Sequence, residues 1–184
     1  MCPSRNPDTL PTSAFDYALP SRLIARHPAA RRDESRLLVV RRDEDRFEHR
    51  IFRDLARMIP AGDVLVLNET RVIPARLLGR KTTGARAEVL LLQLAPGAHA
   101  DDRTVWEALV RPGAKLRPGH VIEIAADLRI EILDTTAGGN RIVRLETPLE
   151  VDAALEKHGV VPLPPYLGRE AEPADAERYQ TVYA

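Results

Sequence analysis

Four polar residues of different chemistry follow a short aliphatic run in the middle of the chain. Residues 64–67 read Val-Leu-Val-Leu, and after them come Asn68, Glu69, Thr70 and Arg71. A buried strand that delivers amide, carboxylate, hydroxyl and guanidinium groups at its carboxyl end is a common way for α/β enzymes to present a site. The alternative is a local turn in which Asn68 and Thr70 satisfy the backbone and Glu69 pairs with Arg71.

A proline-rich segment nearer the end of the chain holds a second set of candidate residues. Residues 162–166 read Pro-Leu-Pro-Pro-Tyr. They are predicted to be extended, because each proline fixes its own φ and restricts the residue before it. A stiff segment that carries Tyr166 and Arg169 can stack a ring on a purine and bind an anion with little loss of entropy. The alternative is a structural crossing in which Tyr166 packs on the prolines.

The final residues add two tyrosines and an amide. Tyr179, Gln180 and Tyr183 follow a short helix predicted at residues 174–179. If this helix continues, Tyr179 and Tyr183 share one face, a spacing more typical of core packing than of a ligand platform.

The elements that must position these residues fall into two kinds. Between residues 73 and 147, short aliphatic runs are separated by turn signals about every 8 to 12 residues, which is typical of a small all-β barrel. Ile130 and Ile132 alternate with charged residues, so this strand has one buried and one wet face. Glu88, in another strand, is expected on a solvated face. The predicted strands are residues 73–80, 87–94, 105–111, 120–124, 128–133 and 141–145.

The flanking segments have a mixed pattern. Strands are predicted at residues 37–40 and 47–51, a short amphipathic helix at 52–58, and a further buried strand at 64–67. After the β module, a helical face begins at Val151 and ends at Gly159. We therefore predict a mixed α/β fold, in which residues 15–71 and 149–184 form an incomplete α/β domain. Residues 72–148 are an inserted antiparallel β-barrel domain, and residues 1–14 are a disordered leader.

Seven segments of this chain, in order, are similar to one known family. They read FDYALPSRLIARHP, SRLLVV, GDVLVLNETRVIPARLLGRK, AEVLLL, WEALVRPGAKL, VPLPPYLGR and RYQTVYA, and they run from Phe15 to the last residue. Together they resemble the S-adenosylmethionine:tRNA ribosyltransferase-isomerases of queuosine biosynthesis. Because members of that family are longer than this chain, the resemblance implies its amino-terminal half. It also implies a larger α/β barrel-like domain interrupted by a small β-barrel.

The resemblance implies an unusual use of S-adenosylmethionine, as a ribosyl donor. The ribose passes to the aminomethyl group of a 7-deazaguanine in tRNA and rearranges to an epoxycyclopentanediol, with loss of adenine and methionine. Such chemistry needs a base, a purine pocket and cationic groups for tRNA phosphates. Catalytic roles fall to Glu69 and Arg71, although a salt bridge from Glu69 to Arg71 or Arg76 is the simpler alternative. The candidate substrate-binding residues are Asn68, Thr70, Arg76, Tyr166, Arg169, Tyr179 and Gln180.

Composition limits the other possibilities. The chain has 27 Lys and Arg against 27 Asp and Glu, so bulk positive charge does not hold it to nucleic acid. Its one cysteine and scattered histidines predict no disulfide within the chain and no zinc site. No apolar run approaches the roughly 20 residues of a membrane span. We expect a cytoplasmic protein that uses S-adenosylmethionine as a substrate and needs no cofactor.

Two non-catalytic functions are alternatives to the enzyme. In one, the β-barrel is an RNA-binding module; in the other, it is a spacer that orients the α/β part. For the enzyme, we expect the full-length protein to be a monomer that acts on tRNA. The present chain alone is expected to be catalytically inactive and to self-associate through exposed apolar surface.

Overall fold

The structure is a computed structural model that describes residues 10–67, 70–96 and 103–180. The chain divides into two compact units, Met1–Ala56 and Arg57–Ala184. Of the predicted leader, residues 1–9 lie outside the described ranges, and the 3₁₀ helix η1 (Thr12–Phe15) includes its last residues. The predicted domain boundaries stay a prediction.

The first unit is built around one β-hairpin. Strands β1 (Arg36–Arg41) and β2 (Arg46–Ile51) are antiparallel, which confirms the two strands predicted here. The remaining elements of this unit are 3₁₀ turns: η2 (Ser21–Leu23), η3 (Arg32–Glu34) and η4 (Phe52–Arg57). The amphipathic α-helix predicted at 52–58 is therefore wrong in type. Since η4 has no buried residue, it lacks the packed apolar face that stabilises most short α-helices.

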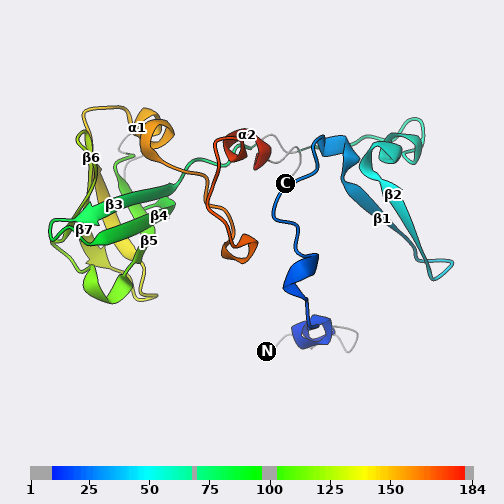
Figure 1. Ribbon diagram of the computed structural model, residues 1–184, viewed down its shortest axis with the longest axis horizontal. Helices are drawn as coiled ribbons and strands as arrows, with labels where there is room; N and C mark the ends of the chain where they lie inside the picture. Colours follow the sequence, from blue (N-terminus) through cyan, green and yellow to red (C-terminus); the bar gives the residue numbers. More distant parts are fainter. Residues whose placement is uncertain (1–9, 68–69, 97–102, 181–184) are drawn as a thin grey trace, which may run out of the picture. The chain divides into compact units, whose positions relative to one another are not determined.

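The second unit contains a closed barrel of six antiparallel strands (Figure 1). Around the barrel the order is β3, β4, β5, β8, β7, β6, after which β6 pairs with β3 again. The strands are β3 (Arg76–Lys81), β4 (Arg86–Leu94), β5 (Val105–Arg111), β6 (Val121–Ala125), β7 (Leu128–Thr135) and β8 (Arg141–Glu146). All six predicted strands of the β module are present, with boundaries shifted by a few residues.

Alternating side chains fill the barrel. In β7, Leu128, Ile130 and Ile132 are fully buried, whereas the residues between them reach the surface, as predicted from their alternation. Burial of each such side chain contributes about 1.5–3 kcal/mol. The largest fully buried residues of the barrel are Leu77, Val89, Leu116, Ile122, Leu128, Ile130, Ile132, Val143 and Leu145. Trp106 joins this core, and its indole Nε1 donates to the Arg103 carbonyl at 2.6 Å.

The loop after β5 is held by a single guanidinium. Arg141 donates from Nε to the Leu116 carbonyl at 2.8 Å and from Nη2 to the Gly113 carbonyl at 2.8 Å. These bonds tie the carbonyls of the first residue of η5 (Gly113–Lys115), a 3₁₀ turn, and of the residue after it to Arg141. The β8 strand therefore fixes the loop that separates β5 from β6.

Helix α1 (Val151–His158) packs against the barrel core through Val151 and Leu155. The predicted end at Gly159 is confirmed, but Gly159 is extended (φ −82°) and not left-handed. Its lack of a side chain matters for another reason: a Cβ here would lie 1.9 Å from the Pro74 carbonyl oxygen. The close approach lets Val160 form a β-bridge with Arg76, with N···O distances of 3.2 and 2.9 Å.

The end of the described chain contains two short helices. The 3₁₀ helix η6 (Pro165–Leu167) ends at Gly168, which has a φ of 63°, and α2 spans Asp175–Arg178. The extended segment predicted at 162–166 is wrong for residues 165–166, which lie in η6, and the Leu163 N–H donates to the Val161 carbonyl at 2.9 Å, as in a tight turn. A proline is well suited to the first helical position because its fixed φ matches the turn, so Pro165 starts η6 and does not prolong the extension.

The buried strand predicted at residues 64–67 is wrong. These residues have no strand assignment, and the exposed fractions are 86% for Val64, 60% for Leu65, 86% for Val66 and 47% for Leu67. A β-strand needs a neighbour for its backbone groups, and no described strand pairs with this segment. The fold is thus mixed α/β with a closed six-stranded antiparallel barrel and few helices.

Gly79 is predicted to be required for barrel closure. A Cβ at this position would lie 2.4 Å from the Glu123 carbonyl oxygen and 2.7 Å from Ile124 Cδ1. Gly79→Ala must push β3 away from β6, so we expect a loss of about 1–3 kcal/mol of stability, measured by urea denaturation.

Gly113→Ala is the matched control, because a Cβ there meets no atom within 4 Å. Equal stability of the two variants would contradict the assigned role of Gly79.

Candidate functional site

A cavity of about 680 Å³ brings together two of the residues selected from the sequence. Arg71 and Gln180 both line it, although they are far apart in the chain. The walls come from the segment before β3, from α1 and the residues after it, and from the region of α2. Its lining is Arg71, Val72, Ile73, Pro74, Arg103, Asp152, Leu155, Glu156, Gly159, Val160, Val161, Ala171, Glu172, Pro173, Ala176 and Gln180.

The side chain of Gln180 joins two segments that line this cavity, because it makes two hydrogen bonds to the backbone of Val72. The Val72 N–H donates to Gln180 Oε1 at 2.7 Å, and Gln180 Nε2 donates to the Val72 carbonyl at 3.0 Å. A third bond runs from Nε2 to the Ala176 carbonyl at 3.2 Å. The side-chain amide thus bonds to both backbone groups of Val72, as a neighbouring strand would, and fixes the backbone next to Arg71.

Charged groups of both signs surround the cavity. Arg103 and Asp152 form an ion pair across it, whereas Glu156 and Glu172 supply two further carboxylates. Asp152 and Arg103 were not selected from the sequence, where each looks like an ordinary surface residue. Only the packing of α1 beside the start of β5 places them together.

Arg169 is held by a buried carboxylate. Its guanidinium donates to both oxygens of Asp175, at 2.6 and 2.8 Å, and the exposed fractions of the two side chains are 13% and 8%. Asp175 also accepts the Glu172 N–H at 2.8 Å. This network fixes the turn before α2. The role of Arg169 in substrate binding stays a prediction, and sequence reasoning missed Asp175 because it lies in a polar run.

The two tyrosines differ in their surroundings. Tyr166 lies in η6 and is 69% exposed, whereas Tyr179 is partly buried and its N–H donates to the Asp175 carbonyl at 2.9 Å. Neither lines the cavity beside Gln180. Asn68, Glu69 and Tyr183 lie outside the described residues, and Thr70 is exposed. The described cavity thus contains Arg71 and Gln180 but not Tyr166.

Arg76 forms a two-pronged ion pair with Glu88. Nε and Nη2 donate to Oε1 and Oε2 at 2.9 and 3.1 Å, and both side chains are about three-quarters covered, with exposed fractions of 27% and 25%. The hydrogen bonds from Arg76 are the main reason that the pKa of Glu88 is lowered. Glu88 lies on the face of β4 away from the core, as expected, but it is only partly exposed because β3 and β4 bring it beside Arg76.

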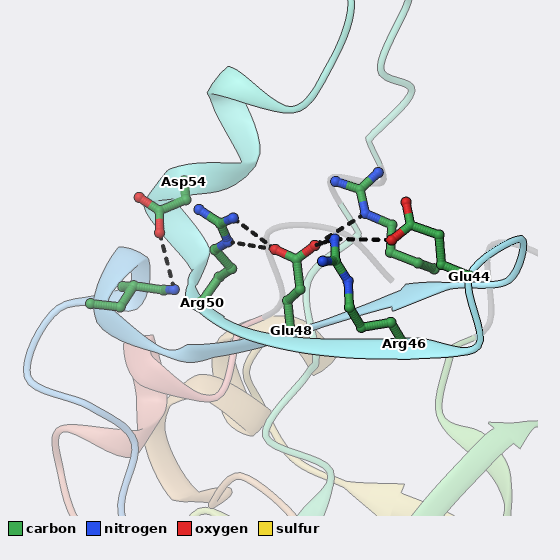
Figure 2. Close-up of polar contacts among 7 residues, drawn as sticks. Glu44, Arg46, Glu48, Arg50 and Asp54 are labelled. Carbon is green, nitrogen blue, oxygen red and sulfur yellow. Dashed lines mark hydrogen bonds and ion pairs between the residues drawn. The ribbon is translucent and has the colours of Figure 1, made fainter.

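The hairpin of the first unit carries a further cluster of arginines (Figure 2). Glu48, 18% exposed, accepts hydrogen bonds from Arg41 at 3.3 Å, Arg46 at 2.9 Å and Arg50 at 2.7 Å. The bond from Arg50, followed by that from Arg41, lowers the pKa of Glu48. Glu44 also pairs with Arg46, at 3.1 Å, so three guanidinium groups are organised around two carboxylates.

The described residues contain no group of three His, Cys, Asp or Glu side chains that could hold a metal ion. None of the helices in these ranges has the length and apolar character of a transmembrane span.

The amide pair of Gln180 leads to a stability prediction. Gln180→Leu leaves the Val72 N–H and carbonyl without partners, and we expect a loss of about 1–3 kcal/mol in urea denaturation. Gln180→Glu keeps the acceptor for the Val72 N–H but turns a carboxylate oxygen toward the Val72 and Ala176 carbonyls, so it should also be less stable than the wild type at pH 7. A Gln180→Leu variant as stable as the wild type would contradict the bridging role.

The lowered pKa of Glu88 predicts how stability depends on pH. A carboxyl group with a depressed pKa in the folded state stabilises above its unfolded value of about 4.3, and this stabilisation is lost as pH falls through the folded pKa. At pH 7 we expect Glu88→Gln to be less stable than the wild type by about 1–2 kcal/mol. The difference should shrink toward pH 3, as measured by urea denaturation at both pH values.

Glu131→Gln is the control, because Glu131 contacts Arg144 at 3.4 Å on the barrel surface. It should change stability by less than about 0.5 kcal/mol at either pH. A constant deficit of Glu88→Gln across this pH range would mean that the ion pair does not cause it.

Comparison with known proteins identifies the family. A family model described as "Queuosine biosynthesis protein" matches residues 12–184. The chain is 49% identical to the S-adenosylmethionine:tRNA ribosyltransferase-isomerase of Pelotomaculum thermopropionicum over 174 residues, 94% of this chain and 49% of that protein. It is 46% identical to the protein of the same name from Syntrophomonas wolfei, over 98% of this chain and 50% of that protein.

One solved structure is also similar. The crystal structure of S-adenosylmethionine tRNA ribosyltransferase from Thermotoga maritima shares 38% identity, covers 79% of this chain and 48% of that chain, and has a TM-score of 0.37. The chain spans about half the length of the curated relatives it matches. Because the family model covers residues 12–184, the chain belongs to the family of queuosine biosynthesis proteins.

Proposed function

We propose that this chain is the amino-terminal part of an S-adenosylmethionine:tRNA ribosyltransferase-isomerase. The enzyme transfers the ribosyl group of S-adenosylmethionine to the aminomethyl group of a 7-deazaguanine in tRNA and isomerises it, which gives epoxyqueuosine in the tRNA. The observation that carries this proposal is the identity of 42–49% to proteins of that name over most of the chain. The comparisons favour this enzyme over a non-catalytic RNA-binding barrel.

The reaction places definite demands on the protein. A base removes a proton from the carbon beside the sulfonium, and a pocket holds the adenine that leaves. Carboxylates near the cation stabilise it, because opposite charges attract strongly in a site shielded from water. We assign the base to Glu69 and the neighbouring anion contact to Arg71. S-adenosylmethionine is a substrate here, and we propose no cofactor.

The cavity beside Gln180 supports this assignment. Its volume of about 680 Å³ is within the range of small-molecule sites, roughly 300–1,000 Å³. Arg71 lines it, and Gln180 fixes the backbone of the adjacent Val72. Glu69 precedes Arg71 by two residues in the sequence. Glu156 and Glu172 are the carboxylates available to a sulfonium. The remaining proposed contacts are Asn68, Thr70, Arg76, Tyr166, Arg169 and Tyr179.

The larger fold follows from the same family. We propose that residues 15–71 and 149–184 belong to a larger α/β barrel-like domain into which the β-barrel is inserted. The exposed aliphatic residues 64–67 support this, since such a run is normally covered in a folded domain. In the cytoplasmic full-length enzyme, a monomer, other parts of the protein would cover them. In the isolated chain they favour self-association.

A chimeric enzyme tests the proposed function. This chain would replace the matching half of the Pelotomaculum relative, to which it is 49% identical. With S-adenosylmethionine and tRNA that carries the aminomethyl-deazaguanine, we expect release of adenine and a modified nucleoside detectable by mass spectrometry.

The chain alone should release no adenine under the same conditions. A chimera that folds cooperatively and binds tRNA but gives no product would contradict the assignment. Turnover by the chain alone would show that this segment is sufficient for catalysis.

A further inference from the structure

The barrel closes through an incomplete seam. Strands β3 and β6 pair at only two positions, Arg80 with Glu123 and Lys81 with Ile122, whereas β3 pairs with β4 over five. The pairing does not continue to Leu78, which lies two residues earlier on the same edge of β3. A hollow of about 1120 Å³ lies beside this seam.

The hollow, called the seam hollow here, is lined mainly by charged side chains. Arginine supplies every positive charge, and no aromatic side chain takes part. The lining is Arg76, Leu78, Gly79, Arg80, Arg86, Ala87, Glu88, Arg111, Pro112, Glu123, Ile124, Ala125, Ala126, Arg129 and Glu170. Five guanidinium groups thus face three carboxylates in a chain whose formal net charge is zero.

Two of these arginines oppose each other directly. Arg80 on β3 and Arg86 on β4 are partners in the strand register, and both are exposed. Directly opposite residues in a sheet have Cβ atoms about 4.5–5.5 Å apart, and like charges at this spacing destabilise the sheet. Arg80 bonds to the Gly84 carbonyl at 2.9 Å, a bond that supplies no negative charge. On its other side Arg80 lies opposite Glu123 of β6, which offsets part of the repulsion, and an anion between the two guanidinium groups would remove the rest.

The carboxylates that line the hollow already have arginine neighbours. Glu88 is bonded to Arg76, and in the register it also lies opposite Arg111. Arg129 pairs with Glu146 at 3.1 Å from outside the hollow. Glu123 lies in register with both Arg80 and Arg129, whereas the cross-strand partner of Arg86 is Arg80. Arg86, with Arg80 beside it, is therefore the arginine of the hollow best able to bind a ligand.

The lining indicates the kind of ligand. Guanidinium groups bind phosphate oxygens through two parallel hydrogen bonds. Since no aromatic ring is present to stack on a base, recognition here would involve the backbone and not the sequence. We propose that the seam hollow binds backbone phosphates of the tRNA substrate, with Arg80 and Arg86 as the principal contacts. This inference rests on the proposed function and assigns the barrel a direct part in it.

The double variant Arg80→Gln/Arg86→Gln tests the inference. Binding of a fluorescein-labelled anticodon stem-loop RNA to the whole chain would be followed by anisotropy over a range of salt concentrations. We expect roughly ten-fold weaker binding and a salt dependence, log K against log salt, that is shallower by about two, one for each lost phosphate contact. The melting temperature should stay equal or rise, because the variant removes a like-charge pair. A merely structural role would lower it.

The control is Arg117→Gln/Arg144→Gln, which removes the same charge from barrel residues outside the hollow. It should bind RNA within two-fold of the wild type. Equal losses of RNA affinity in the two double variants, or no loss in Arg80→Gln/Arg86→Gln, would overturn the seam hollow as the RNA site. The proposal that tRNA is the substrate would be unaffected. If the wild-type chain binds no RNA, both the inference and the tRNA-binding part of the proposed function fail for this segment. Displacement of RNA by poly-glutamate at equal charge would indicate an acidic peptide and overturn the RNA assignment.

Discussion

Closure of the six-stranded sheet onto itself is the constraint on which the described structure depends. A closed barrel leaves no long free edge and encloses one aliphatic core, here formed by residues such as Leu77, Ile130 and Val143. Closure requires β3 to approach the β6 backbone, and Gly79 makes that approach possible because it has no side chain. Because β3 and β6 pair over only two residues, a charged hollow remains along the seam. The residues that close the barrel therefore lie beside the proposed phosphate contacts.

Arginine and carboxylate pairs organise the surface around this core. Glu88 holds Arg76, Asp175 holds Arg169, and Glu48 holds three arginines of the hairpin. Arg76, Arg169 and Arg50 each make two hydrogen bonds to their carboxylate, so the planar fork is fixed at low entropic cost. The Arg80 and Arg86 pair is different, since two arginines face each other across β3 and β4, and the one acidic residue in register with Arg80 is Glu123 on β6. A local conflict of this kind is typical of functional sites, where stability is given up for binding.

Together these features assign different roles to two sites of the proposed enzyme. The cavity beside Gln180 is of a size for a nucleoside and lies next to the Arg71 backbone. The seam hollow is wide, lined by arginine and free of aromatic rings, as suits a polyanion. The bridge between Arg76 and Val160 links the barrel to the segment that leads toward Gln180. The barrel would then hold the tRNA backbone while the flanking segments hold the small substrate.

The sequence by itself determined the family, through the resemblance of seven segments in order. It also determined the six barrel strands and helix 151–158, since these depend on local alternation, turn residues and spacing. It also selected Arg71 and Gln180, which share a cavity. Only the tertiary structure decided which charges meet: Glu88 with Arg76, Asp175 with Arg169, and Arg80 opposite Arg86. The predicted buried strand at residues 64–67 failed for the same reason. Burial and pairing depend on neighbours distant in the chain, and a local apolar pattern does not contain that information.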